Sequence, residues 1–194
     1  MQIIPPDTLL SAYAEGIFPM AEDGEISWYS PTMRGLIPID ERFHIPRGLR
    51  QSMKRKPFEV RFNTSFRAVM EGCGEREETW IDPAIIESYC QLNELGFAYS
   101  MECWDDEGLQ GGLYGVALGK AFFGESMFSR KTDASKIALV YLVNWMRENE
   151  FSLLDTQWMT EHLTQFGGME VPREDYLKLL ADALKDLAQL ADSK

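Results

Sequence analysis

The chain has 194 residues, of which 45% are apolar and 26% charged, a composition typical of a globular protein with one or two domains. Disordered, collagen-like and low-complexity classes are therefore excluded. No window approaches about eighteen consecutive apolar residues, and no basic segment precedes an apolar stretch at the N-terminus. We expect a cytoplasmic protein without a membrane span. Three cysteines and two histidines at wide spacing predict no metal site.

The net charge of −12 disfavours a nucleic-acid partner, because a phosphate backbone repels an acidic protein. The distribution of charge changes this expectation. Residues 42–67 hold eight cations and one acid, Glu59, so this basic strip carries +7 and the remaining residues carry −19. The strip favours either a polyanion-binding face or a solvated basic helix, and the composition leaves both open. The acidic remainder suggests either a second, cationic ligand or a surface that serves solubility.

Apolar spacing and turn residues predict the elements of the first part of the chain. A short helix is expected at 8–15, with Asp7 as its N-cap and Gly16 just after its end. Proline and glycine punctuate residues 17–46, which predicts loops and short extended pieces. A basic helix at 46–56, a strand at 58–62 and a helix at 65–73 follow.

The second part begins with a helix at 84–95, which has the strongest sequence signals in the chain. Asp82 is expected to be its N-cap, and Pro83 occupies the first helical position. Asp133 is expected to cap the long helix that follows a meander of three strands. The predicted order is strands 97–104, 109–118 and 120–128, helix 134–149, strand 151–154, a helical turn at 160–165 and helix 173–191. These are the parts of an α+β layer of the acyltransferase type. We expect a small N-terminal lobe, 1–60, on a larger domain, 61–194.

Five glycines interrupt the strand-like residues 111–129. Because glycine weakens a strand, either the hairpin bulges or a ligand passes closely over the sheet, and both remain open. The spacing matches neither a Walker A loop nor a dinucleotide fingerprint. Glu125 lies in this stretch among apolar residues, so its carboxylate needs a partner, which could be Arg130, Lys136 or a substrate amine.

A carboxylate and an amide, Asp155 and Gln157, follow directly after the strand predicted at 151–154. In extended geometry residues i and i+2 face the same way, so Asp155 can accept a hydrogen bond from the Gln157 amide. The carbonyl oxygen of Gln157 would then point outward and orient an amine. The alternative is an Asp that forms a turn or caps a helix. His44 and His162 receive no role, and without a nucleophile motif covalent catalysis is not expected.

Several motifs occur together and in order: GIFP at 16–19, WYSP at 28–31, Arg34-Gly35, TWI at 79–81, FFGESMFS at 122–129, DASK at 133–136, LDTQ at 154–157 and TEHL at 160–163. On these residues the chain resembles the bacterial leucyl/phenylalanyl-tRNA–protein transferases. The resemblance implies transfer of Leu, Phe or sometimes Met from aminoacyl-tRNA to the N-terminal α-amine of proteins that begin with Arg or Lys, which marks them for degradation. It also implies a GNAT-like domain with a mixed sheet, a small N-terminal lobe and no cofactor.

By motif position the resemblance implies a catalytic pair, Asp155 and Gln157, and a site carboxylate, Glu125. Trp80 and Tyr89 would hold the terminal adenosine, and Met20 stands where some members carry a stacking tryptophan. The apolar pocket would be formed by Leu113, Phe122, Met127, Met146 and Leu154. The tRNA would be bound by Arg47, Arg50, Lys54, Arg55 and Lys56. We expect a monomer.

Two other classes of function remain open as alternatives. An acyl-CoA-dependent N-acyltransferase of the same fold would need a pyrophosphate-binding turn, which residues 130–136 do not supply. A non-catalytic RNA-binding module is compatible with the basic strip alone, and it would not depend on the carboxylate of Asp155.

Overall fold

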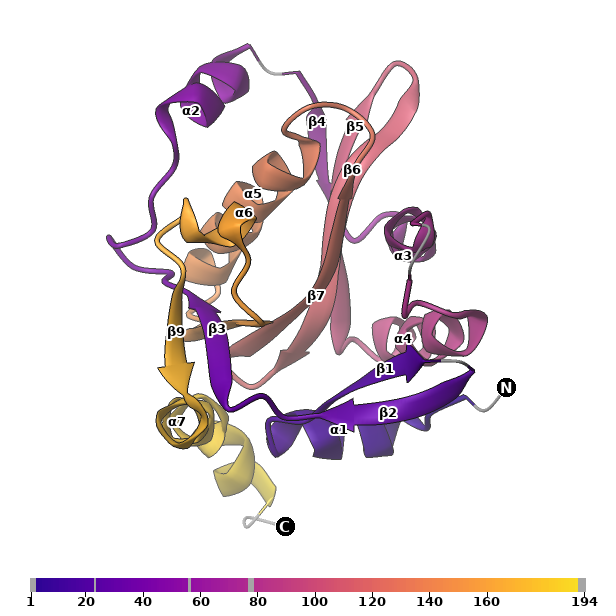
Figure 1. The fold of residues 1–194 in the computed structure, drawn as a ribbon, viewed down its shortest axis with the longest axis vertical. Coiled ribbons are helices and arrows are strands. Elements are labelled where there is room, and N and C mark those ends of the chain that lie inside the picture. Colours follow the sequence, from indigo (N-terminus) through magenta and orange to yellow (C-terminus); the bar gives the residue numbers. More distant parts are fainter. Residues whose placement is uncertain (1–2, 23, 56, 77–78, 192–194) are drawn as a thin grey trace.

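The computed structural model describes residues 3–22, 24–55, 57–76 and 79–191 (Figure 1). Its main feature is a seven-stranded sheet in the order β4-β5-β6-β7-β8-β3-β9, beside a two-stranded hairpin, β1-β2. The strands are β1 Phe18–Glu22, β2 Glu25–Tyr29, β3 Met33–Ile37, β4 Glu59–Phe62, β5 Ala98–Asp105, β6 Gly108–Leu118, β7 Ala121–Ser129, β8 Leu153–Gln157 and β9 Met169–Pro172. The helices are α1 Pro6–Ala14, α2 Arg47–Lys54, α3 Phe66–Gly74, α4 Pro83–Glu94, α5 Ala134–Glu148, α6 Glu161–Thr164 and α7 Arg173–Ala191.

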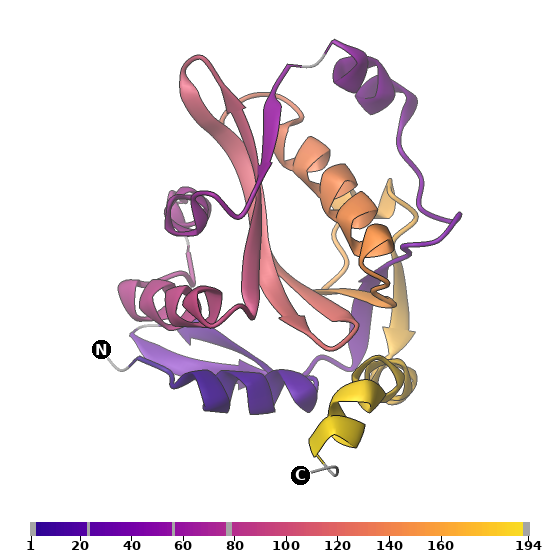
Figure 2. The same ribbon diagram turned by 180° about the vertical axis from the view of Figure 1, so that it is seen from behind.

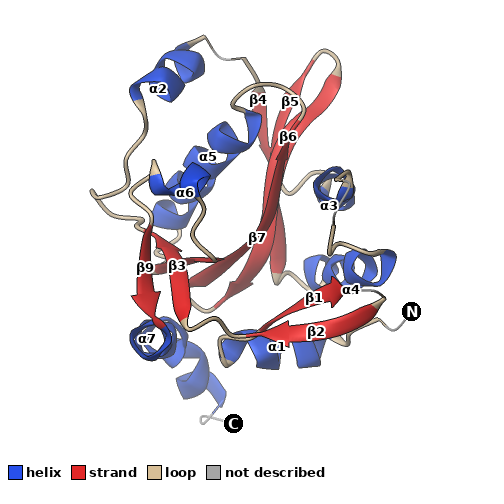
Figure 3. Cartoon of the chain, viewed as in Figure 1, coloured by secondary structure: helices blue, strands red, loops and turns tan. Residues whose placement is uncertain are grey.

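Helices cover both faces of the sheet, with α3 and α4 on one face and α5 on the other (Figures 1 and 2). Each face buries its own apolar core, as expected for a sheet between two helical layers. Helix α7 packs along β9, β3, β8 and β7, and α1 packs against α4 and α7. This arrangement confirms the predicted α+β class with a mixed sheet flanked by helices (Figure 3). None of the described helices is long and apolar enough to cross a membrane.

All strand pairs of the large sheet are antiparallel except β7 and β8. These two run parallel and pair at only three positions, from Ala121 with Leu153 to Phe123 with Asp155. Beyond this point both strands continue but no longer pair with each other. The sheet therefore has a gap between β7 and β8.

A β-bulge lies in each strand beside this gap. On β7, Tyr114 and Gly115 of β6 face Ser126 and Gly124, so Glu125 is the extra residue. A Cβ atom on Gly115 would lie 2.2 Å from the main-chain oxygen of Phe123, so only glycine fits this position.

On β8 the extra residue is Thr156, because Leu36 and Gly35 of β3 face Asp155 and Gln157. A bulge turns the side chains that follow it and often lies next to a functional site. The bulge predicted for the glycine-rich stretch is confirmed on β7, and the passage of a ligand over these glycines stays a prediction.

Most helices and strands match their prediction, because their signals are local. Asp82 caps α4, since its side chain accepts a hydrogen bond from the main-chain nitrogen of Ile85. The predicted caps at Asp7 and Asp133 are wrong: α1 already begins at Pro6, and Asp133 adopts a left-handed conformation without a capping hydrogen bond.

Two strands of the large sheet lie where the sequence predicted only short extended pieces or no strand. Strand β3 comes from the first sixty residues and pairs between β8 and β9. Strand β9 follows Gly168, where no strand was expected. The division into domains at residue 60 remains a prediction.

Candidate active site

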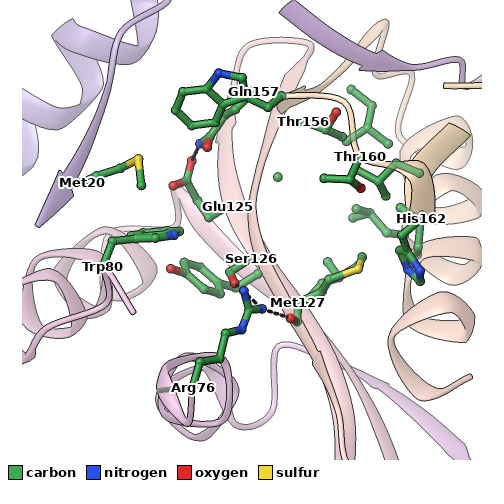
Figure 4. Close-up of a pocket in the computed structure, with 18 residues that line it drawn as sticks. Met20, Arg76, Trp80, Glu125, Ser126, Met127, Thr156, Gln157, Thr160 and His162 are labelled. Atoms are coloured by element: carbon green, nitrogen blue, oxygen red, sulfur yellow. Dashed lines mark hydrogen bonds between the residues drawn. The ribbon is translucent and has the colours of Figure 1, made fainter. Parts of the chain in front are cut away.

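A cavity of about 320 Å³ opens where β7 and β8 separate (Figure 4). Residues that follow the last paired positions on both strands line it, together with side chains from β6, α5, α6 and the segment before α4. Figure 4 shows Glu125 and Gln157 joined by a hydrogen bond, with Met20 and Trp80 beside them. Thr156, Thr160 and His162 lie across the cavity.

The carboxylate of Glu125 is held by three side chains. The hydroxyl of Tyr13 donates a hydrogen bond to Oε1 over 2.7 Å, and the hydroxyl of Tyr89 donates to Oε2 over 3.3 Å. The amide nitrogen of Gln157 donates to Oε1 over 2.9 Å. The two tyrosine hydroxyls also contact each other. Glu125 is therefore fixed in one orientation at the wall of the cavity.

The pKa of Glu125 is raised from 4.5 to about 7, because burial, together with the nearby charge of Asp155, outweighs the hydrogen bonds that the carboxylate accepts, which lower the pKa. Arg130 and Lys136 pair with other carboxylates, so these two of the three suggested partners are wrong, and the substrate amine stays a prediction. No described cation forms an ion pair with Glu125. Near neutral pH the group can therefore exist in either protonation state.

Asp155 does not line the cavity but lies fully buried behind it, in an ion pair with Arg34. Nε and Nη2 of Arg34 donate to both carboxylate oxygens over 2.6 to 3.0 Å, and the hydroxyl of Tyr176 donates to Oδ2 over 2.8 Å. Nη1 of Arg34 donates to the main-chain oxygen of Gly16 over 3.0 Å. The guanidinium lies between the rings of Phe18 and Tyr176. The charge of Asp155 is thus compensated within the protein.

The predicted hydrogen bond between the side chains of Asp155 and Gln157 is wrong. Because Thr156 is an extra residue in a bulge, the two side chains no longer point to the same face. Oδ1 of Asp155 instead accepts a hydrogen bond of 2.8 Å from the main-chain nitrogen of Gln157, which has φ +64°. The amide of Gln157 therefore reaches Glu125.

Apolar side chains form most of the remaining wall of the cavity. They come from β6, β7, α5, β8 and α6 and are Leu113, Met127, Leu139, Leu142, Leu154 and Leu163. The cavity thus brings together many side chains that the sequence predicted for one site, namely Met20, Trp80, Leu113, Glu125, Met127, Leu154 and Gln157. Their individual roles remain predictions.

Three predicted site residues, Tyr89, Phe122 and Met146, do not line the cavity and are fully buried. The side chain of Phe122 belongs to the core on the α5 face of the sheet. Met146 lies in the same core. The ring of Tyr89 packs edge-on against Tyr13 and Tyr114, which leaves no exposed face for an adenine.

Further polar side chains line the cavity that the sequence did not single out. Arg76 donates to the main-chain oxygen of Met127. The hydroxyls of Tyr114 and Thr156 and Nε2 of His162 are buried without a hydrogen-bond partner among the described residues. Burial lowers the pKa of His162, which favours the neutral ring. Motif position was the only available signal for Thr156 and His162, in LDTQ and TEHL.

The cysteines are not suited to act as nucleophiles. Burial raises the pKa of Cys73 and of Cys103 to about 12, and it also raises the pKa of Cys90. None of the three lines the cavity. Within the described ranges, no three His, Cys, Asp or Glu side chains are placed to hold a metal ion.

The basic strip divides into two parts. Arg42, Arg61 and Arg67 form ion pairs with neighbouring carboxylates. Helix α2 and its C-cap carry exposed cations on the side of the sheet that also holds α5 and α6 (Figure 1); they are Arg47, Arg50, Lys54 and Arg55. Lys56 lies outside the described residues.

The chain is similar to known proteins over most of its length. A family model described as "Leucyl/phenylalanyl-tRNA protein transferase" matches residues 36–181, and the model of its N-terminal domain matches residues 3–32. A protein of Akkermansia muciniphila named "Leucyl/phenylalanyl-tRNA--protein transferase" is 60% identical over 188 residues, which cover 94% of this chain and 97% of the relative. A protein of the same name from Herpetosiphon aurantiacus is 52% identical over 182 residues, 94% of this chain and 95% of the relative.

Some solved structures resemble the fold of this chain. The structure of L-PGS from Bacillus licheniformis has a TM-score of 0.45 and 16% identity, with 84% of this chain and 56% of that chain covered. A conserved protein of Bacteroides thetaiotaomicron gives a TM-score of 0.49 and 8% identity, over 84% of this chain and 62% of that chain.

The protein is an aminoacyltransferase, as its close relatives are. More specifically, the chain belongs to the leucyl/phenylalanyl-tRNA–protein transferase family.

Proposed function

We propose that the protein transfers leucine or phenylalanine from aminoacyl-tRNA to the N-terminal α-amine of proteins that begin with Arg or Lys. The observation that carries this proposal is the pair Glu125 and Gln157, joined by a 2.9 Å hydrogen bond at the wall of a mostly apolar cavity. The identity of 51 to 60% with relatives named as such transferases supports it.

An aminoacyl ester is already activated, so the reaction needs an oriented amine and no protein nucleophile. Because Nε2 of Gln157 is committed to Glu125, its carbonyl oxygen is free to accept a hydrogen bond from the incoming amine. The sequence predicted such a device with Asp155 as the orienting carboxylate. The hydrogen bonds support Glu125 in that role instead.

In the reaction, the neutral amine attacks the ester carbonyl carbon, a C–N bond forms and the bond to the ribose oxygen breaks. The amine loses one proton and the ribose oxygen gains one. An α-amine has a pKa of about 7.7 to 8.0, so only modest assistance is needed. Glu125, with its pKa raised to about 7 by burial, is suited to accept that proton near neutral pH.

The apolar side of the cavity suits the side chain of the transferred residue. Met127 and Leu113 face this space together with leucines of α5 and α6. Met is flexible and polarisable and adapts to both a branched and an aromatic side chain. On the other side of Glu125, Met20 and Trp80 are the candidates to hold the terminal adenosine (Figure 4).

The exposed cations of α2 and its C-cap, among them Arg50 and Arg55, are the candidates for the tRNA backbone. The acidic remainder of the molecule favours acceptors with a cationic N-terminal residue. We further propose that the protein acts as a monomer in the cytoplasm, where charged tRNA and new protein N-termini both occur.

The test is transfer of radiolabelled leucine or phenylalanine from charged tRNA to a peptide that begins with Arg. A Gly-initiated peptide and an Nα-acetylated Arg peptide serve as controls. Labelling of the free Arg peptide alone is expected. Absence of labelling, with charged tRNA still bound, would refute the proposal and favour a non-catalytic RNA-binding module.

A further inference from the structure

We propose that Arg34 is a positioning residue for the transfer reaction, because it holds Asp155 in the orientation that aims the amide of Gln157 at Glu125. This inference rests on the proposed function. Arg34 contacts neither the cavity nor a group in it, and it acts through a chain of three hydrogen-bonded contacts.

The first contact fixes the carboxylate of Asp155. Arg34 binds it through two nitrogens, and the hydroxyl of Tyr176 adds a third donor. A two-pronged contact restricts a carboxylate to one plane, unlike a single ammonium group. The rings of Phe18 and Tyr176 hold the guanidinium from two sides. The orientation of Asp155 is therefore set by groups remote from the cavity.

The second contact fixes the main chain of Gln157. Its φ of +64° lies in the left-handed region, which a residue with a side chain adopts at a cost. Oδ1 of Asp155 accepts the main-chain N–H of Gln157 over 2.8 Å, a local hydrogen bond that stabilises such a turn. If the carboxylate rotated, this conformation would lose its support.

The third contact depends on that turn. Only with this backbone does the bulge at Thr156 send the Gln157 side chain to Glu125 on the neighbouring strand, where the 2.9 Å hydrogen bond forms. A group that sets a reactive side chain needs accuracy of a fraction of an ångström. Loss of Arg34 should therefore impair turnover more than binding of charged tRNA.

The experiment compares Arg34→Lys with Arg42→Lys. Arg42 makes the same two-pronged contact with Asp40, but on the exposed surface. We expect Arg34→Lys to lower kcat per folded molecule by about ten-fold or more, with the KM for charged tRNA changed by less than about three-fold. Arg42→Lys should change neither. The folded fraction is measured by near-ultraviolet circular dichroism in each preparation.

A double-mutant cycle distinguishes positioning from a merely structural role. If Arg34 acts through Gln157, then Arg34→Lys should lower kcat by less than about two-fold when Gln157 is already Ala. Effects that multiply in the double variant would overturn the proposal, as would an unchanged kcat of Arg34→Lys. If the wild type itself transfers nothing, the proposed function fails, and this inference fails with it.

If Arg34→Lys does not fold, Tyr176→Phe takes its place in the cycle. This change removes only the hydroxyl that donates to Asp155 and keeps the ring against Arg34. Its control is Tyr99→Phe, which removes a hydroxyl bonded to a main-chain oxygen away from the cavity. A lower kcat for Tyr176→Phe alone is expected, and equal values for both variants would overturn the proposal.

Discussion

Between about pH 4.5 and pH 7, ionisation of Glu125 should lower the free energy of unfolding of the wild type. Glu125→Gln, which cannot ionise at this position, should not show this decrease. The carboxyl group is buried, and burial raises its pKa to about 7 in the folded protein, against 4.5 for an ordinary glutamate. The hydroxyls of Tyr13 and Tyr89 and the amide of Gln157 surround the group but do not balance its charge.

The sign follows from proton binding in the two states. Below pH 4.5 the folded and unfolded chains both carry the proton. As the pH rises, the unfolded chain releases its proton first, and this ionisation stabilises the unfolded state. The free energy of unfolding therefore falls until the folded state also ionises near pH 7. A change in pKa from 4.5 to about 7 corresponds to about 3 kcal/mol, at about 1.4 kcal/mol for each pH unit.

The assay is urea denaturation of the wild type and Glu125→Gln at closely spaced pH values. All other groups are shared, so the difference in free energy of unfolding isolates Glu125. That difference should move by about 3 kcal/mol in favour of the Gln variant between pH 4.5 and pH 7. Glu59→Gln is the control, because Glu59 is exposed and its pKa is lowered. A difference that stays constant across this range would refute the reasoning.

Two more predictions concern the main chain near Gln157 and the binding of tRNA. A Cβ atom on Gly35 would lie 2.7 Å from the main-chain nitrogen of Met159, so Gly35→Ala should cost about 1–3 kcal/mol and lower transfer. A Cβ atom on Gly48 would meet no atom within 4 Å, so Gly48→Ala should reduce neither stability nor transfer. An equal loss for both variants would contradict the argument. Charge reversal at Arg50 and Arg55 should weaken tRNA binding and flatten its dependence on salt, by about 0.7–0.9 in the logarithmic slope for each lost phosphate contact. An unchanged slope in filter-binding titrations would exclude these contacts.

Elements with local signals could be predicted from the sequence, and elements that depend on distant pairing could not. The helix at 173–191 and the cap at Asp82 follow from periodicity and from neighbouring residues. Strands β3 and β9 belong to the sheet only because residues from opposite ends of the chain pair with each other. A five-residue strand among prolines carries no signal for such a partner.

The candidate site shows the same limit at the level of single side chains. Its carboxylates and its amide could be found from residue type and motif. The partners of Asp155 and Gln157 could not, because a single extra residue, Thr156, reverses the face to which the following side chain points. Arg34 stands in a motif of the sequence, but its burial depends on rings from β1 and α7. The sequence of the basic strip likewise does not reveal which of its cations form ion pairs with neighbouring carboxylates.

The most direct test of the central claim measures transfer and binding of charged tRNA in the same preparations of wild type, Gln157→Ala and Gln91→Ala. The control residue lies on α4 and does not line the cavity. If the gap between β7 and β8 is the transfer site, Gln157→Ala loses most of its transfer to the Arg-initiated peptide and binds charged tRNA like the wild type, while Gln91→Ala is unchanged in both. Full transfer by Gln157→Ala, or a parallel loss of transfer and binding, would contradict the account.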